Sequence, residues 1–385
     1  MPEYYLFISL FLIFYTYFGY PAILLIWSLF KNKPNYQEYS QNLPSISILI
    51  AAYNEEDIIL EKLENIKKMK YAPGRIEVLI GSDASDDNTN QIIASSDIVF
   101  LRLIEFNERR GKPAVLNDLA KIATGEYLVF SDANTKFSPD ALIKLVEPFT
   151  DDTIGGVIGN LSFRTNGIDN PGGVGETLYF KYENFIKNLE GLIHSTIVAN
   201  GSVYAIRREL YKPIPVKKLI MDDLFIPLSL IAQEFRLVFR KDIHVREDPS
   251  LSAREEFEKK ERIVAGGMEV VRQFKKLLHP KNGFISFALW SHKVVRWMIP
   301  ILLVIAFLSN LFLFSNSPFF GILFILQLAF YLSAILGKYL EKIGIKFTPF
   351  ILSYYFIIVN LAIVSGFKRF LKGSAGTTWK RTRRV

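Results

Sequence analysis

The chain has 385 residues, of which 50% are hydrophobic, 14% are aromatic and 22% are charged, and its formal net charge is +8. The high aromatic content excludes a disordered chain, because disordered segments are poor in aromatic residues and rich in charge. The sequence contains no cysteine, which excludes disulfides, thiolate zinc sites and cysteine nucleophiles. The length is sufficient for one large domain with additional segments.

The first additional segment is an apolar run at the N-terminus. Residues 4–30 carry no charge and are long enough to cross a bilayer core of about 30 Å. A cleaved secretory signal is the alternative, but it requires basic residues before the run and a cleavage site after it. Here Glu3 precedes the run, and Lys31 and Lys33 follow it. We therefore expect an uncleaved transmembrane anchor over residues 1–30.

Two further uncharged stretches lie near the C-terminus. Residues 297–337 are too many for one crossing at about 1.5 Å per residue, and the Ser315 to Pro318 segment inside them predicts a turn. Residues 347–367 form the last stretch. We expect three transmembrane helices at about 297–314, 318–337 and 347–367. An amphipathic helix on the membrane surface is expected over 281–296, and a basic tail over 368–385.

Basic residues beside the spans predict the orientation of this multi-pass protein. Lys31 and Lys33 place residues 31–280 on the cytoplasmic side of the cell membrane. The basic tail fits the same side, but three crossings after the domain would place it outside. Either one C-terminal segment does not cross, or the tail departs from the rule. The basic segments are expected to contact membrane lipids, and nucleic-acid binding is disfavoured because no aromatic platform accompanies them.

Residues 31–280 alternate short aliphatic runs with helical patterns. The runs 46–51, 76–82 and 127–131 predict strands that are buried on both faces, and the patterns 55–70, 88–95 and 112–123 predict helices. This alternation indicates an α/β fold with a mostly parallel, Rossmann-like sheet. In such sheets, ligands bind beyond the carboxyl ends of the strands.

Acidic and amide side chains follow three of these predicted strands, in segments 51–56, 82–89 and 131–135. Any one of them is most simply a turn or helix-capping residue. Three such clusters at one sheet edge, together with Gly111 and Lys112 at the start of a helix, suit a divalent cation and a phosphate-bearing ligand.

In their order and spacing, these motifs resemble the membrane-integrated family 2 glycosyltransferases, the group that contains hyaluronan, chitin, cellulose and poly-N-acetylglucosamine synthases. The resemblance extends from residue 44 to about 270 and is carried by segments 44–55, 82–89, 111–117 and 131–135. It implies a GT-A-like fold and a nucleotide-sugar donor, with Asp83 on the base. The donor-binding residues that it implies are Ala51, Tyr53, Glu55, Asp83, Lys112, Asp132 and Arg262.

The same resemblance implies a divalent cation, Mg²⁺ or Mn²⁺, held by Asp132 and Asn134. This chain has the amide Asn134 where the family has a second carboxylate. An amide offers one carbonyl oxygen without charge, so the cation should be held less tightly. The alternative is that Asn134 is only a turn residue.

Asp222 and Asp223 match the family's acidic pair, which implies that Asp223 is the catalytic base and Asp222 its neighbour. A carboxylate can take the proton of an attacking hydroxyl, and a like charge beside it raises its pKa toward neutrality. The alternative is a capping pair at the start of a helix over 222–234. Both interpretations can hold at once.

In segment 259–266, only Arg262 and Gly266 match the family's pattern, and Ile263 replaces its tryptophan. The match implies that Arg262 contacts the donor diphosphate, and the missing tryptophan weakens the case for a processive enzyme. A solvated helix face is the alternative interpretation. Gly201 and Ser202 resemble residues on the acceptor side of the family's site.

The sequence thus predicts an inverting glycosyltransferase that moves a sugar to a glycan or lipid-linked acceptor in the biosynthesis of cell-surface polysaccharide, and the resemblance implies a UDP-sugar as the donor. The first alternative is a transferase that adds one sugar to a polyprenyl-phosphate-linked acceptor. The second is a membrane scaffold whose α/β domain only senses nucleotide, although a sensor has no need of the paired carboxylates.

Overall fold

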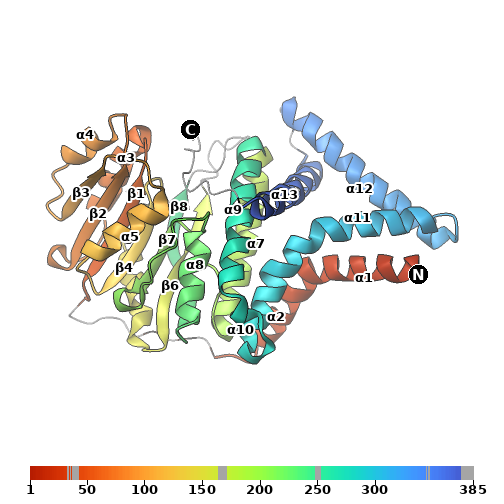
Figure 1. Ribbon diagram of the computed structural model, residues 1–385, viewed down its shortest axis with the longest axis horizontal. Helices are drawn as coiled ribbons and strands as arrows, with labels where there is room; N and C mark the ends of the chain where they lie inside the picture. The colour runs from red at the N-terminus through yellow and green to blue at the C-terminus, as the bar shows by residue number, and fades with distance from the viewer. Residues whose placement is uncertain are drawn as a thin grey trace.

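The computed structural model describes residues 1–32, 34, 36, 43–163, 171–247, 253–343, 345 and 347–373, without the side chains of 171–174, 253, 341 and 342. An α/β unit is joined to a group of long helices (Figure 1). The first part of the predicted basic tail, 368–373, is described, and residues 374–385 lie outside the description.

The α/β unit is built on an eight-stranded sheet of order β3-β2-β1-β4-β7-β6-β8-β5. Strands β3, β2, β1 and β4 are parallel, β7 is antiparallel to both neighbours, β8 is parallel to β6, and β5 is antiparallel to β8. This confirms the predicted mostly parallel α/β sheet. The strands are β1 (Ile46–Ala52), β2 (Ile76–Asp83), β3 (Leu101–Phe106), β4 (Tyr127–Asp132), β5 (Lys136–Phe137), β6 (Ile154–Phe163), β7 (Val203–Arg207) and β8 (Arg236–Glu247).

Helices cover both faces of the sheet, which explains why strand β1 is apolar along its whole length. On one face, Leu49 packs in a core with α5, and on the other Ile48 packs in a core with α3. The α-helices of this unit are α3 (Glu56–Lys67), α4 (Thr89–Ala94), α5 (Lys112–Ile122), α6 (Ala141–Val146), α7 (Pro171–Ile193), α8 (Asp222–Ile231) and α9 (Ala253–Gln273). Short 3₁₀ turns occur at Pro73–Arg75, Glu147–Thr150, Arg208–Leu210, Lys275–Leu278 and Pro280–Asn282.

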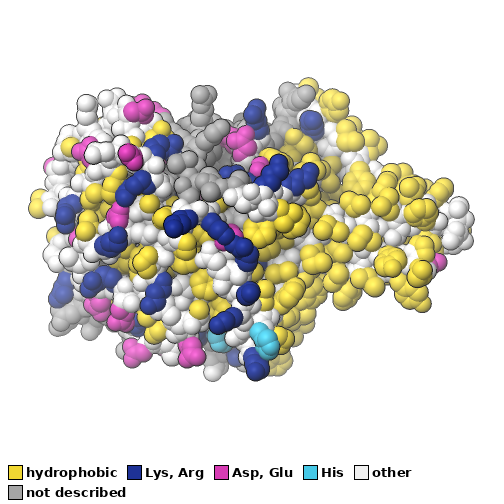
Figure 2. Space-filling model, viewed as in Figure 1, with side chains coloured by type: hydrophobic (Ala, Val, Ile, Leu, Met, Phe, Trp, Pro, Cys, Tyr) yellow, Lys and Arg dark blue, Asp and Glu magenta, His cyan; other side chains and the backbone are white. Residues whose placement is uncertain are grey.

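Among the residues that the structure describes, four helical segments are long and apolar enough to cross a membrane, one N-terminal and three C-terminal, as predicted. The chain is therefore a membrane protein, and exposed apolar side chains cover this end of the molecule (Figure 2). The segments comprise α1 (Pro2–Phe14) and α2 (Tyr20–Ser28) joined by a π-turn (Tyr15–Gly19); α10 (Phe284–Leu289) and α11 (Val295–Leu313) joined by a second π-turn (Trp290–Val294); α12 (Pro318–Lys342); and α13 (Thr348–Leu371).

The prediction of a separate surface helix over 281–296 is wrong. Residues 284–313 form one continuous helical segment, and the side chains of His292 and Arg296 are buried. Both pair with Glu183 on α7. The polar face formed by His292 and Arg296 therefore contacts protein carboxylates, and not lipid headgroups.

Candidate functional site

A cavity of about 1090 Å³ opens at the carboxyl edge of the sheet and extends between the long helices. Its polar end is lined by residues that follow β1 and β4 and by the start of α8. Its other end is lined by apolar side chains of α1, α11, α12 and α13. The charged or amide residues at the polar end are Glu55, Lys112, Asp132, Asn134, Asp222, Asp223, Glu247 and Arg262.

Lys112 lies at the centre of the polar end. Its Nζ is 2.8 Å from Asp132 Oδ1 and 3.1 Å from Asp222 Oδ2. Burial by itself would lower the pKa of Lys112, but these two carboxylates outweigh it and raise the pKa. The ammonium group therefore stays charged and holds together two acidic motifs that are 90 residues apart in the chain, at positions 132 and 222.

The turn before Lys112 is fixed by Asp83. The two Asp83 carboxylate oxygens accept the backbone N–H groups of Arg110 (2.8 Å) and Gly111 (3.0 Å). Gly111 has φ of +89°, a conformation that favours glycine. Because Asp83 is fully buried and both of its oxygens are used here, it orders the Lys112 turn. Each carboxylate oxygen can accept a further hydrogen bond, so the binding of a nucleotide base by Asp83 stays a prediction.

The other residues expected to bind the donor divide into two groups. Ala51, Glu55, Lys112, Asp132 and Arg262 line the cavity. Among the described residues, the cavity wall does not include Tyr53, whose ring instead stacks under the Arg109 guanidinium at 3.5 Å. The structure thus brings together most of the predicted set, with Tyr53 and Asp83 behind it.

Asp222 and Asp223 are the first two residues of α8, and both line the cavity. Burial, followed by the negative charge of Asp222, raises the pKa of Asp223 to about 6. Lys112, Lys293 and Lys187 oppose this shift. A carboxylate with this pKa is ionised at neutral pH and is still basic enough to accept a proton from a substrate.

This pKa predicts the pH dependence of a reaction that uses Asp223 as its base. The base must be ionised, so we expect the rate to fall as pH decreases through about 6. Asp222→Asn removes the like charge and lowers the pKa of Asp223, so the fall in rate should occur at lower pH in this variant. The measurement is kcat/KM as a function of pH across the acidic range. If the rate of the variant falls at the same pH as that of the parent, another group titrates.

Asn134 and Ser202 are joined by Glu247, a residue that the sequence analysis missed. Asn134 Nδ2 donates to Glu247 Oε1 at 2.8 Å, and Ser202 Oγ donates to Oε2 at 2.8 Å. Glu247 is buried at the end of β8, in phase with the buried residues Ile243 and Val245. A carboxylate at a core-facing position of an alternating strand was the available signal.

The predicted acceptor segment faces the acidic pair. A Cβ added to Gly201 would lie 3.9 Å from both Asp223 Oδ2 and Lys112 Nζ. The backbone N–H of Ala199 donates to the Asp223 carbonyl at 2.7 Å. On the other side, Lys187 of α7 donates to the Ala199 carbonyl at 3.3 Å and to Asn200 Oδ1. Residues 199–202 are therefore held between α7 and α8.

Arg262 projects from α9 into the polar end. Burial lowers its pKa, and the carboxylates of Asp222, Asp132 and Asp223 act in the opposite direction. The neighbouring Lys259 is not on a solvated helix face, because it pairs with the buried Glu176 at 2.6 Å. Lys260 likewise pairs with Glu256 at 3.4 Å. The helix thus presents its basic side chains to the cavity.

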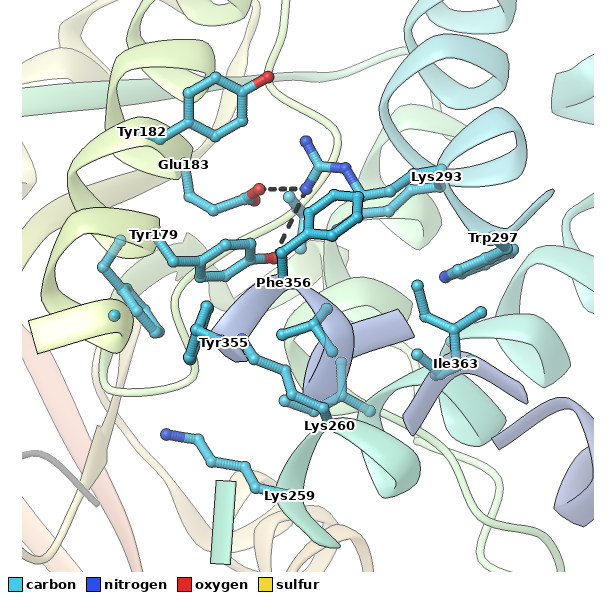
Figure 3. A pocket seen from close by; sticks show the side chains of 18 of the residues that line it. Tyr179, Tyr182, Glu183, Lys259, Lys260, Lys293, Trp297, Tyr355, Phe356 and Ile363 are labelled. Carbon is cyan, nitrogen blue, oxygen red and sulfur yellow. Dashed lines mark hydrogen bonds and ion pairs between the residues drawn. The ribbon is translucent and has the colours of Figure 1, made fainter. Parts of the chain in front are cut away.

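The middle of the cavity is shown in Figure 3, where α7, α9, α11 and α13 meet. Arg296 pairs with Glu183 and lies 3.5 Å from the Tyr179 hydroxyl. Beyond this point the wall becomes apolar, with Trp297 and Phe356 in view. It continues along the membrane helices through Leu10, Leu303, Ala306, Leu326, Phe330 and Ile363.

Asp132 and Asn134 supply some, but not all, of the oxygen ligands that a divalent cation needs. No group of three or more His, Asp or Glu side chains in the described ranges is arranged to hold a metal ion. Asp132 contributes a carboxylate that pairs with Lys112 through Oδ1, and Asn134 contributes a carbonyl oxygen, because its amide nitrogen donates to Glu247. Mg²⁺ commonly takes one or two protein oxygens and completes its shell with water and substrate phosphates.

Among solved structures, the fold is similar to that of the mannosyltransferase PcManGT from Pyrobaculum calidifontis, determined with GDP-Man and Mn²⁺. The TM-score is 0.73 at 20% sequence identity, and the match covers 96% of this chain and 99% of that one. At this identity the similarity establishes the GT-A-like fold.

Two curated proteins match shorter segments. The poly-β-1,6-N-acetyl-D-glucosamine synthase of Staphylococcus aureus is 35% identical over 127 residues, 32% of this chain and 30% of that protein. The β-monoglucosyldiacylglycerol synthase of Trichormus variabilis is 32% identical over 133 residues, 33% of this chain and 28% of that protein. The chain thus spans less than a third of the length of these curated relatives.

The sequence pattern of glycosyl transferase family 2 matches residues 47–241. This segment covers half of the chain. It includes β2 to β7, nearly all of β1 and the first half of β8, together with Lys112, Asp132 and the acidic pair at the start of α8. The chain therefore belongs to glycosyl transferase family 2.

Proposed function

We propose that this glycosyltransferase moves a sugar from a nucleotide-sugar to a hydroxyl of a lipid-linked acceptor, with inversion at the anomeric carbon. One observation carries the proposal: a single cavity connects the Lys112 and Asp223 cluster with an apolar wall between the membrane helices. An acceptor with a polar end and a hydrocarbon chain matches both parts of it.

In the proposed reaction, Asp223 accepts the proton of the acceptor hydroxyl as its oxygen bonds to the anomeric carbon. The bond from that carbon to the diphosphate oxygen breaks, and its electron pair leaves with the nucleoside diphosphate. Lys112 and Arg262 face the position of the diphosphate and offset its charge. A divalent cation held by Asp132 and Asn134 would supply further charge neutralisation when bound.

The raised pKa of Asp223 also supports a hydroxyl as the nucleophile. A hydroxyl must lose a proton during attack, so it needs a base, whereas a phosphate oxygen is already ionised at neutral pH. A phosphate nucleophile would moreover approach two carboxylates of like charge. The Asp222 and Asp223 pair is therefore better suited to a hydroxyl acceptor.

The experiment is a panel of nucleotide-sugars given to the purified full chain with Mn²⁺ or Mg²⁺. Each donor is tested with a polyprenyl-linked glycan, with diacylglycerol and with a soluble oligosaccharide. We expect release of nucleoside diphosphate and a single-sugar, lipid-soluble product from the lipid-linked acceptor. Transfer to the soluble oligosaccharide alone, or no transfer from any donor, would contradict the proposal.

Polymer synthesis is the second candidate, favoured by the similarity to the poly-β-1,6-N-acetyl-D-glucosamine synthase of Staphylococcus aureus. It would extend a glycan at the same acceptor position, next to Gly201 and Ser202. The two candidates differ in product, because a polymerising enzyme yields a ladder or high polymer from one acceptor.

The proposed cation site at Asp132 and Asn134, with an amide in place of a second carboxylate, gives a separate prediction. Asn134→Asp places a second carboxylate beside Glu247, so we expect a lower melting temperature without metal. With the cation present, the added charge should strengthen Mn²⁺ binding by about 10-fold, measured by titration of the free ion. The matched control is Asn90→Asp, because Asn90 also donates to a glutamate, Glu105, at 2.7 Å. Equal Mn²⁺ affinity in parent and Asn134→Asp would argue against a cation at this position.

The packing of α13 supports a proposal for the side of the membrane on which the basic tail lies. Tyr355 donates to Glu256 of α9 at 2.8 Å, and Arg369 lies 3.9 Å from Glu261. Helix α13 is seen nearly end-on in Figure 1, whereas α1 and α11 run across the view. Packing along the charged helix α9 favours a position of α13 at the membrane surface, on the side of the catalytic domain.

A labelling experiment tests this placement. Because the chain has no cysteine, Lys372→Cys introduces a single reactive thiol at the end of α13. We expect an impermeant thiol reagent to label it from the same side as Lys121→Cys in the α/β domain. Labelling of the two positions from opposite sides would mean that α13 crosses the membrane.

A further inference from the structure

Eight lysine and arginine side chains line the cavity, and most already have acidic partners. Lys112, Lys218, Lys259, Lys260 and Arg296 form ion pairs with carboxylates. Lys187 donates to neutral oxygens of residues 199 and 200. Within the described parts of the chain, Lys187, Arg262 and Lys293 are the lining cations without an ion pair, and of these only Lys187 has hydrogen bonds to other residues. Arg262 faces the carboxylate end, whereas Lys293 comes from the membrane helices.

The carboxylates whose charges act on Lys293 are those of Glu183, Asp223 and Glu190, and in the described ranges none of them forms an ion pair with it. Glu183 pairs with Arg296 and lies 3.0 Å from His292 Nε2. Glu190 lies 2.7 Å from His292 Nδ1 and accepts the Tyr20 hydroxyl at 2.7 Å. The positive charge of Lys293 is therefore not neutralised by a direct contact. An unpaired ammonium group in a cavity wall is costly unless a ligand supplies the opposite charge.

The backbone places Lys293 in this position through a local irregularity. Residues Trp290–Val294 form a π-turn between α10 and α11, and Lys293 is its fourth residue. Such turns occur frequently at functional sites, because the extra residue changes where the following side chains point. On the same helix, Trp297, Leu303 and Ala306 continue the cavity wall into its apolar part. Figure 3 shows Lys293 and Trp297 on one side of this space.

We propose that Lys293 binds a phosphate group of the acceptor, separate from the hydroxyl that reacts at Asp223. This inference rests on the proposed function and specifies its substrate class as an amphiphile with a phosphate linkage between its sugar and its hydrocarbon chain. The hydrocarbon lies along α11, the phosphate contacts Lys293, and the sugar hydroxyl reaches Asp223. Uncharged lipids such as diacylglycerol lack the phosphate contact.

The test uses decyl phosphate as the probe and measures its binding to the purified full chain by calorimetry. We expect Lys293→Met to weaken binding by about 10-fold or more, because a charge-assisted hydrogen bond is lost. Lys293→Arg should stay within about threefold of the parent, because it keeps the charge. The matched control is the exposed Lys281→Met, which should bind as the parent does. Equal affinity of Lys293→Met and the parent would overturn the inference.

Two further measurements test whether Lys293 binds the phosphate of the acceptor or that of the donor, and whether its side chain has a structural role. Saturating nucleoside diphosphate should leave decyl phosphate binding intact, and displacement of the probe would mean that Lys293 belongs to the donor site. Without ligand, Lys293→Met should melt at or above the parent temperature, because an unpaired charge is removed. A lower melting temperature would indicate a structural role and count against the inference.

The binding assay needs no turnover, so the inference and the proposed function can fail independently. If decyl phosphate binding depends on Lys293 while no donor is used, the proposed function is at fault. If a lipid-linked acceptor is glycosylated but Lys293→Met changes neither probe binding nor the acceptor KM, the inference is at fault.

Discussion

Asp223→Asn is expected to lower kcat by about 10²–10⁴-fold, the range typical for the loss of a general base. The amide keeps the size of the side chain but cannot accept the proton of the acceptor hydroxyl. Binding of nucleoside diphosphate should be nearly unchanged, because Lys112 and Arg262 remain in place. The measurements are single-turnover transfer and calorimetric titration of the nucleotide.

The matched control is Asp140→Asn, which removes a carboxylate that pairs with Lys144 at 2.5 Å on the distant helix α6. This variant should keep the parent rate. If Asp223→Asn transferred sugar at close to the parent rate, Asp223 would not be the base. If it lost nucleotide binding as well as transfer, the residue would belong to the donor site.

Arg296→Met is expected to destabilise the protein by about 3–5 kcal/mol, the range observed when one partner of a buried ion pair is removed. Arg296 is 8% exposed and pairs with Glu183, which also contacts His292 at 3.0 Å. Without the guanidinium, the buried Glu183 carboxylate keeps its contact with His292 but loses its arginine partner. The measurement is the melting temperature of the full chain in detergent.

An exposed ion pair provides the comparison. Arg254 and Glu258 are 3.3 Å apart on α9 with largely exposed side chains, so Arg254→Met should leave the melting temperature unchanged. The double variant Arg296→Met with Glu183→Gln should recover part of the loss, because the unpaired charge is removed as well. A melting temperature of Arg296→Met equal to that of the parent would mean that water or lipid replaces the guanidinium.

Much of the fold could be predicted from the sequence because its signals are local. The aliphatic runs that became β1, β2 and β4 lack alternation, which is diagnostic of strands covered on both faces. Asp132 and Lys112 could be placed together because a parallel sheet brings its strand ends to one edge, whereas Asp222 was assigned to the site from the family resemblance. The hairpin turn before Pro318 was likewise predicted from four consecutive residues.

What the sequence did not reveal depends on contacts between distant segments. The segment 281–296 has an amphipathic pattern, and such a pattern does not distinguish lipid headgroups from a protein partner. The partners of its polar face are Glu183 and Glu190. In the sequence they precede His292 by 109 and 102 residues. Asp83 was assigned to the base from the family resemblance, and its two backbone donors, at residues 110 and 111, could not be seen in a strand motif.

Helix α7 links the reacting groups to the membrane helices. Lys187 holds the 199–200 segment beside Asp223, and Glu190, almost one turn further along, holds Tyr20 of α2 and His292 of the second π-turn. If Asp223 acts as the proposed base, helix α7 fixes its distance from the membrane helices. Acceptors whose spacer between the lipid and the reacting hydroxyl differs from that distance are then expected to be poorer substrates.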